Sequence, residues 1–366
     1  MKFFDDFGMD FAIRCVLSGV RDGAAEVGEV LLTVESIKEG DPESYLERFC
    51  GLGRRLAAAS AESLAAGNRR TSWGQALRAA NYLFAGAWWA PGTSYADQVV
   101  PLWREHRAAW DLAVDTWPAI TERKLLDTPQ GALPTYWFRP NEGTPVGAVV
   151  MIQGLDTPLS DAAMSGLSEG LRRGYAVMLM EGPGQGEALF DRGLTLADSW
   201  DGVVPACLES ARGRISGPVT VMGINHGSYF VLDAATKALD ADAIVVDPAA
   251  YDLATDLVAG VSDPIQAAKL AMAFGSAATP ESAAALAESL KFDPARLAAI
   301  TAPVLQLSSA EAESFAGQSQ IAAQNLGDNS VLQNFAKESG AALDCEIGAP
   351  QVRNAVVYDW LDALIT

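Results

Sequence analysis

The 366-residue sequence has few of the residues on which most metal and nucleophilic sites depend. It contains only two histidines, His106 and His226, and four cysteines. No two cysteines form a C-x-x-C pair, and no cysteine–histidine cluster has the spacing of metal ligands. We therefore expect free thiols in a reducing, cytoplasmic compartment, and we expect neither a metal nor another cofactor.

Long apolar runs and a basic surface are lacking as well. No stretch approaches the roughly 20 apolar residues that span a bilayer, so we expect no membrane partner, and we expect no signal peptide. The formal net charge of −20 would repel phosphate backbones, which excludes nucleic acid as an expected partner. The expected partner is a small-molecule substrate, and a homodimer stays open.

Residues 1–125 are predicted to form a helical cap or lid domain. Apolar and alanine-rich stretches at 45–63, 72–90 and 95–113 have the spacing of packed helices. Pro91-Gly92 interrupts this pattern and predicts a break between helices. Tryptophan, tyrosine and phenylalanine are concentrated here, and we interpret most of them as the core of the helical domain.

Residues 126–366 alternate short apolar runs with helical segments. This alternation predicts an α/β fold class with a mostly parallel, doubly wound sheet that helices cover on both faces. A long helical insertion is expected at about 252–299. The predicted strands lie at 136–138, 147–152, 175–180, 219–222, 243–246, 304–307 and 343–347.

Three segments follow predicted strands, at 153–156, 181–187 and 223–229. Carboxyl ends of parallel strands meet at one edge of a sheet, where such folds build their sites. The segments read QGLD, EGPGQGE and GINHGSY. In this order they resemble H-G-L-D-S, D-G-P-G-Q-G-E and G-R-S-L-G-G-Y, patterns of the α/β-hydrolase branch with an N-terminal helical cap. That branch includes fermentation/respiration-switch-like esterases and carbon–carbon bond hydrolases, and the resemblance implies an α/β-hydrolase core.

The chain departs from this family at each member of the catalytic triad. Asn225 occupies the place of the nucleophilic serine, and a carboxamide cannot become an alkoxide nucleophile. By the same alignment Ala312 stands at the place of the aspartate, with Glu311 and Glu313 as neighbours that would replace it in a shifted register. The segment 346–351 contains no histidine where the family has one. An acyl-enzyme route is therefore not expected.

The family's oxyanion site depends on backbone groups that these changes leave in place. In this fold the N–H after the nucleophile position and an N–H from an earlier loop bind the substrate oxygen. Here the resemblance assigns these roles to the N–H of His226 and to Gly154 or Leu155. We expect Gln153, which stands where the family has histidine, and Tyr229 to contact substrate nearby.

A general base must come from the remaining side chains. His226 is our first candidate, because imidazole is suited to proton transfer near neutral pH; the alternative is a side chain packed beside the site. His106 is the second candidate, against the alternative of a solvated helical face. Asn225 is expected to bind substrate, orient a neighbour or stabilise the turn, and Tyr229 is a further candidate base.

Several carboxylates have two interpretations. We expect Asp156 to shape its loop by accepting backbone N–H bonds. Asp247 and Asp252 follow a predicted strand, and either would carry charge in the pocket or cap a helix.

The sequence also resembles hydrolase-like enzymes of tetronate and spirotetronate biosynthesis, polyketide antibiotic pathways in which acetate is eliminated from an O-acetylated tetronate. This resemblance favours a cofactor-independent lyase. The alternatives are a carbon–carbon bond or ester hydrolase that activates water directly, and a catalytically inactive binding protein.

Overall fold

The chain forms two compact units in a computed structural model that describes residues 2–275, 279–312 and 314–365. The helical unit comprises the residues up to Thr121 together with Pro158–Ser168 and Asp263–Lys269. The sheet unit comprises Glu122–Thr157, Glu169–Ser262 and the chain from Leu270 onward. No helix of the described ranges is long and apolar enough to cross a bilayer.

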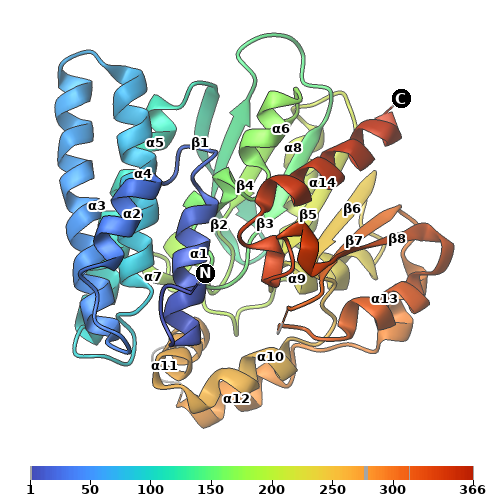
Figure 1. Ribbon diagram of the computed structural model, residues 1–366. Helices are drawn as coiled ribbons and strands as arrows, with labels where there is room; N and C mark the ends of the chain where they lie inside the picture. The colour runs from blue at the N-terminus through green and yellow to red at the C-terminus, as the bar shows by residue number, and fades with distance from the viewer. Residues whose placement is uncertain (1, 276–278, 313, 366) are drawn as a thin grey trace. The chain divides into compact units, whose positions relative to one another are not determined.

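The helical unit is built around a long antiparallel helix pair, α3 and α4 (Figure 1). The two helices pack closely because glycine faces the partner helix: a Cβ on Gly53 would lie 2.6 Å from Cγ of Leu83. Tyr82 and Trp110 are fully buried in this unit, as the sequence predicts for most of its aromatic residues. Its helices are α1 (Phe7–Ser18), α2 (Val27–Val34), α3 (Pro42–Ala65), α4 (Arg69–Ala87) and α5 (Val99–Thr116).

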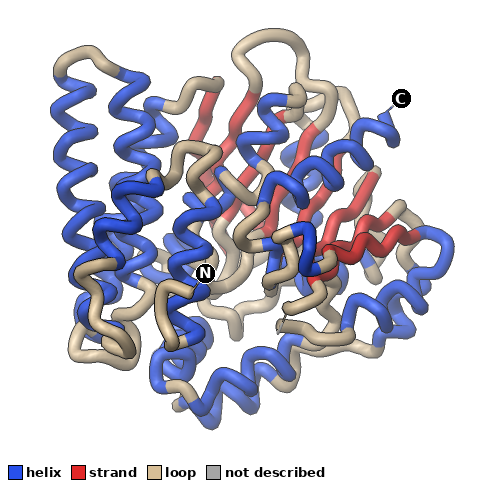
Figure 2. Tube along the Cα trace, in the orientation of Figure 1, coloured by secondary structure: helices blue, strands red, loops and turns tan. Residues whose placement is uncertain are grey.

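The sheet unit contains an eight-stranded sheet of order β1-β2-β4-β3-β5-β6-β7-β8 (Figure 2, red). From β3 to β8 neighbouring strands are parallel, and β2 pairs with β4 antiparallel. This confirms the predicted fold class. The strands are β1 (Ile120–Thr128), β2 (Gly131–Arg139), β3 (Ala148–Ile152), β4 (Ala176–Met180), β5 (Val219–Ile224), β6 (Ala243–Asp247), β7 (Val304–Ser309) and β8 (Ser330–Phe335).

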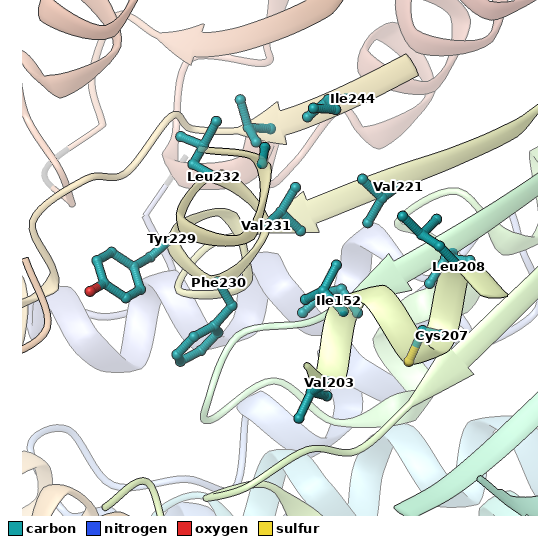
Figure 3. Close-up of a cluster of buried hydrophobic side chains, with 14 of the residues drawn as sticks. Ile152, Val203, Cys207, Leu208, Val221, Tyr229, Phe230, Val231, Leu232 and Ile244 are labelled. Atoms are coloured by element: carbon teal, nitrogen blue, oxygen red, sulfur yellow. The ribbon is translucent and has the colours of Figure 1, made fainter. Parts of the chain in front are cut away.

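Helices cover both faces of this sheet, with α14 in front of the strands and α8 behind them in Figure 1. Val221 and Val231 belong to the core on the side of α8 and α9 (Figure 3). On the other face α14 packs against α6, where a Cβ on Gly170 would lie 2.5 Å from the Tyr358 hydroxyl. These helices are α6 (Leu167–Arg172), α8 (Val203–Arg212), α9 (Gly227–Ala235) and α14 (Pro350–Ile365).

Helices also follow β4, β6 and β7. The stretch at 252–299 contains no strand among its described residues, and its main helices are α10, α11 and α12. From β3 onward, strands and helices therefore alternate along the sheet unit except in this helical stretch. The bounds are α7 (Gly186–Phe190), α10 (Leu253–Ala259), α11 (Pro264–Phe274), α12 (Pro280–Ala287) and α13 (Gln318–Leu326).

The predicted strand at 343–347 is wrong. The last strand is β8, at Ser330–Phe335, and Asp344–Glu346 forms a short 3-10 turn. Cys345 and Glu346 both have positive φ, +50° and +53°, which a strand cannot accommodate. β8 lies at the sheet edge and is only partly buried, so it lacks the continuous apolar run that identifies the inner strands.

Candidate active site

The sequence motif around Asn225 forms a sharp turn between β5 and α9. Asn225 has φ +53°, a left-handed conformation in which asparagine is favoured over most other residues. A Cβ on Gly227 would collide with the carbonyl oxygen of Ile152, and one on Gly223 would lie 2.6 Å from Cα of Ser228. Both glycines of the motif are therefore required by backbone packing, and Asn225 stands at the apex.

The carboxamide of Asn225 orients a neighbour, one of the roles expected for it. The N–H of His226 donates to Oδ1 of Asn225 at 2.6 Å. The backbone N–H of Asn225 donates in turn to the Asp247 carbonyl at 2.7 Å. The first expected oxyanion donor, the N–H of His226, thus has an acceptor within the protein.

The loop after β3 is fixed by Gln185, a residue of the glycine-rich segment after β4. Its Nε2 donates to the carbonyls of Gln153 and Gly154 at 2.8 and 3.0 Å, and its Oε1 accepts the N–H of Gly182 at 2.8 Å. The next N–H, that of Leu155, donates to Nδ1 of His226 at 3.4 Å. In this structure the N–H groups of His226 and Leu155 are both engaged within the protein, so either must exchange its acceptor to bind a substrate oxygen.

His226 lies between two carboxylates in the sheet unit and is buried. Its Nε2 is 3.3 Å from Oδ2 of Asp256, and its Nδ1 is 4.0 Å from Oδ1 of Asp156. Burial alone would lower the pKa of His226, but the hydrogen bond with Asp256 and the charges of both carboxylates outweigh it and raise the pKa. The ring also meets the edge of Phe315, with centroids 5.8 Å apart.

These contacts fix the tautomer of neutral His226. A backbone N–H can only donate, so the Nδ1 that faces Leu155 must be the acceptor. The ring proton then lies on Nε2, where Asp256 accepts it. The unprotonated Nδ1 faces the loop after β3, and His226 has the arrangement of a base whose far side is held by a carboxylate.

The other histidine has a different environment. His106 lies on α5 in the helical unit, 3% exposed, with Nδ1 2.9 Å from the Ala80 carbonyl. Its ring packs against Phe84 at 5.4 Å. The expected alternative of a solvated helical face is therefore wrong. Burial lowers the pKa of His106 to about 4, so this side chain is neutral at physiological pH.

Two predicted substrate contacts lie in unlike surroundings. Tyr229 packs against Phe230 and Phe292, on the side of α9 away from Val221 in Figure 3. Burial and the charge of Asp233 raise its pKa, so at neutral pH the side chain is a protonated phenol and no phenolate is available as a base. Gln153 is 1% exposed, and within the described structure neither Oε1 nor Nε2 of its amide has a hydrogen-bond partner.

The carboxylates for which the sequence left two interpretations have different environments in the structure. Asp252 caps α10 through the N–H and hydroxyl of Thr255, as the helix-cap interpretation predicts. Asp156 faces His226, and no backbone N–H of the described loop is bonded to its carboxylate, contrary to the expected loop role. Glu311 pairs with Lys337 at the surface, and Glu313 lies outside the described residues.

Asp247 belongs to a buried charge cluster behind the turn. Its Oδ2 is 2.5 Å from Nε of Arg353, and the same Nε is 3.4 Å from Glu346. Glu346 also accepts a hydrogen bond from the Ser309 hydroxyl at 2.7 Å. Burial and the charge of Asp247 raise the pKa of Glu346 despite Arg353, so the surroundings favour its protonated form.

Two residues of this site could not be identified from the sequence. Asp256 is 30 positions beyond His226 on α10, and the long helical stretch gives no local signal for its contact. Gln185 lies within the recognised glycine-rich segment, yet the motif does not show that both ends of its amide are used.

The chain is similar in sequence to several fungal hydrolases. No family model matches the chain. It is 26% identical to the hydrolase acrC of Aspergillus aculeatus over 69% of this chain and 64% of that protein. It is 27% identical to the hydrolyase poxO of Penicillium oxalicum, over 69% and 63%. The chain is similar to these hydrolases, and its fold is that of the α/β-hydrolases.

Solved structures agree with this α/β-hydrolase fold. The 2,6-dihydroxy-pseudo-oxynicotine hydrolase aligns with a TM-score of 0.78 at 17% identity, over 96% of both chains. Wild-type AbyA5 aligns with a TM-score of 0.67 at 17% identity, over 92% of this chain and 89% of the other. The matches to the curated α/β-hydrolase relatives span less than two thirds of those relatives' lengths.

Proposed function

We propose that this α/β-hydrolase-fold protein is a cofactor-independent lyase of secondary metabolism. The observation that carries the proposal is the replacement of the nucleophile by Asn225 beside a buried histidine held by Asp256. An asparagine at the apex cannot form an acyl-enzyme, whereas a buried imidazole with a carboxylate on its far side suits proton abstraction. The substrate class we propose is an O-acetylated tetronate-type intermediate.

The reaction would proceed by base-induced elimination. Nδ1 of His226 accepts a proton from carbon next to the substrate carbonyl, and the electron pair of the broken C–H bond forms an enolate. The enolate collapses with cleavage of the C–O bond to acetate, leaving an exocyclic alkene. The carboxylates of Asp156 and Asp256 stabilise the imidazolium that results. The relative named hydrolyase supports elimination as a reaction class, because a hydro-lyase eliminates water.

Hydrolysis is the second candidate, favoured by the hydrolase names of several relatives. In that reaction His226 would remove a proton from water, and the resulting hydroxide would add to a carbonyl carbon, with cleavage of the ester C–O bond or of the adjacent carbon–carbon bond. The chain has a base for this step without needing a nucleophilic side chain. The two reactions differ in the bond that breaks and therefore in the products.

An assay in ¹⁸O-labelled water separates the two reactions. Elimination leaves both original oxygens in the acetate and gives an alkene, whereas ester hydrolysis places a solvent oxygen in the acetate and gives an alcohol. We expect unlabelled acetate from an O-acetylated tetronate, measured by mass spectrometry. Labelled acetate with an alcohol product would favour hydrolysis.

Two histidine variants test the base. We expect His226→Ala to lower kcat about 10²–10⁴-fold, the usual contribution of a positioned base. His106→Gln is the matched control and should keep near-full activity, because His106 is bonded within its own helical unit. Near-full activity of a folded His226→Ala protein would exclude His226 as the base. Substrate binding without any turnover would favour an inactive binding protein.

A further inference from the structure

We propose that His226 and the N–H of Leu155 form a proton-linked oxyanion site. When Nδ1 of His226 takes up a proton, Leu155 releases its N–H to an anionic oxygen of the ligand. The class of ligand is an enolate or a carboxylate. Only the statement that the anion during turnover is an enolate rests on the proposed function. The link between protonation of His226 and release of the Leu155 N–H follows from the contacts of these residues.

The linkage arises because the backbone N–H of Leu155 can only donate a hydrogen bond, whereas Nδ1 of His226 can accept one only while it is unprotonated. Leu155 N–H donates to Nδ1 of His226 at 3.4 Å, a long bond that is easily exchanged. A proton on Nδ1 turns this atom into a donor, and two N–H groups then face each other. Oδ1 of Asp156, 4.0 Å from Nδ1, is the nearby acceptor for the new proton. Leu155 N–H is left without its acceptor and is available to an anion.

The charges around the imidazole also make anion binding depend on protonation of His226. Asp156 contributes its carboxylate from the loop after β3, and Asp256 contributes one from α10. The loop after β7 contributes the uncharged ring of Phe315, and the turn contributes the uncharged Asn225. Two carboxylates beside neutral His226 repel an incoming anion. An imidazolium offsets one of them, so anion binding is favoured only after proton uptake.

The loop geometry keeps Leu155 N–H in place while its acceptor changes. Gln185 holds the two preceding carbonyls, those of Gln153 and Gly154, from the segment after β4. The peptide that carries Leu155 N–H therefore cannot turn away freely when the bond to His226 is lost. A donor that is held in position before the anion forms gives the strongest stabilisation.

In the proposed reaction this exchange accompanies proton transfer. The substrate C–H bond breaks, its proton moves to Nδ1, and its electron pair becomes the enolate. The N–H of Leu155 then passes from Nδ1 to the enolate oxygen, and no electrons leave the substrate. The N–H of His226 stays with Oδ1 of Asn225. Leu155 thus contributes most when the negative charge is present.

Nuclear magnetic resonance of the intact protein tests the linkage without any turnover. Carbonyl-¹³C glycine with ¹⁵N leucine selects Gly–Leu peptides, of which the chain has five, and Leu155→Ile identifies the Leu155 signal. The other four amides are internal controls for folding. The ¹⁵N signals of the two imidazoles are assigned with His106→Gln. Spectra are recorded from about pH 5 to 9, with and without acetate as the anion probe.

We expect the Leu155 amide to move upfield on acidification with the midpoint of His226, and neutral His226 to carry its proton on Nε2. Acetate should move the Leu155 amide downfield below that midpoint and not above it. In His226→Ala the pH response of Leu155 should disappear. A Leu155 signal independent of the protonation of His226, or an equal acetate response throughout, overturns the proposal. Since no catalysis is measured, this failure is distinct from failure of the proposed lyase activity.

Discussion

At the scale of single residues, the site depends on what surrounds His226. Its place at the turn could be predicted from the G-x-N-x-G spacing, because this motif specifies a strand, a left-handed residue and a helix in succession. The partner Asp256 could not be predicted, because its contact depends on how α10 folds back toward the turn. The amide of Gln153, which has no hydrogen-bond partner within the described structure, could not be predicted either. A sequence shows residue type but not which polar atoms lack partners.

Asp256 should set the pH dependence of activity. A base must be neutral to act, so kcat/KM should rise with pH as His226 loses its proton. Because the pKa of His226 is raised, the midpoint of this rise should lie above about 6.5, the ordinary pKa of histidine. Asp256→Asn removes the nearer charge, so the acidic limb should move to lower pH. The check is the pH profile of kcat/KM in the wild-type protein and the variant.

Two matched variants separate charge from structure in this experiment. Asp156→Asn should move the limb less, because Asp156 is farther from His226 and more exposed than Asp256. Asp252→Asn keeps a good helix cap on the same helix and should leave the limb unchanged. If Asp252→Asn shifts the limb as far as Asp256→Asn, the position of α10 rather than the charge of Asp256 governs the profile.

At the scale of elements, the sequence predicts inner strands better than edge strands. β3, β4 and β5 are buried along their whole length and appear as continuous apolar runs. β1 carries charged residues and β8 contains three polar residues among its six, so neither has that signal. Because β8 is not recognised from the sequence, the last strand is predicted at 343–347. This segment is a loop that contains the buried Glu346.

That loop provides a stability test. The pKa of Glu346 is raised in the folded protein, so its contribution to stability is present below its unfolded pKa and is lost as pH rises through the folded pKa. Glu346→Gln imitates the neutral acid and cannot ionise. We expect the variant to be more stable than wild type at alkaline pH, by on the order of 1 kcal/mol for each unit of raised pKa.

Urea unfolding at several pH values measures this difference. Glu338→Gln is the matched control, because Glu338 is exposed in the same loop. The control should keep the wild-type pH dependence. A Glu346→Gln protein that is less stable than wild type throughout the alkaline range would show that the ionised carboxylate is needed by Arg353.

At the scale of the whole molecule, the fold was more predictable than the chemistry. Three motifs in one order are sufficient for a fold, because backbone packing at Gly223 and Gly227 leaves few alternatives. The chemistry depends on which protein groups already accept a hydrogen bond from each backbone N–H of the site. The resemblance assigns the N–H groups of His226 and Leu155 to the oxyanion site, and in this structure both are engaged by side chains of this chain.

The two histidines have opposite effects on the two units. His106 in the helical unit has its pKa lowered to about 4, so its contribution to stability is present above about pH 6.5 and is lost as pH falls toward 4. His226 in the sheet unit has a raised pKa, so its contribution is present at acidic pH and is lost as pH rises through the folded value. Acidification should therefore weaken the helical unit before the sheet unit.

Hydrogen exchange read by mass spectrometry, corrected for intrinsic rates, resolves the two units. Between about pH 7.5 and about pH 5, linkage through His106 removes about 2 kcal/mol, and we expect α4 and α5 to lose protection relative to β3–β6. His106→Gln cannot be protonated and retains a side-chain donor for the Ala80 carbonyl, so it should abolish most of this loss. Equal loss of protection in both units, unchanged by His106→Gln, would mean that the chain unfolds as one cooperative body and that His106 does not determine its acid sensitivity.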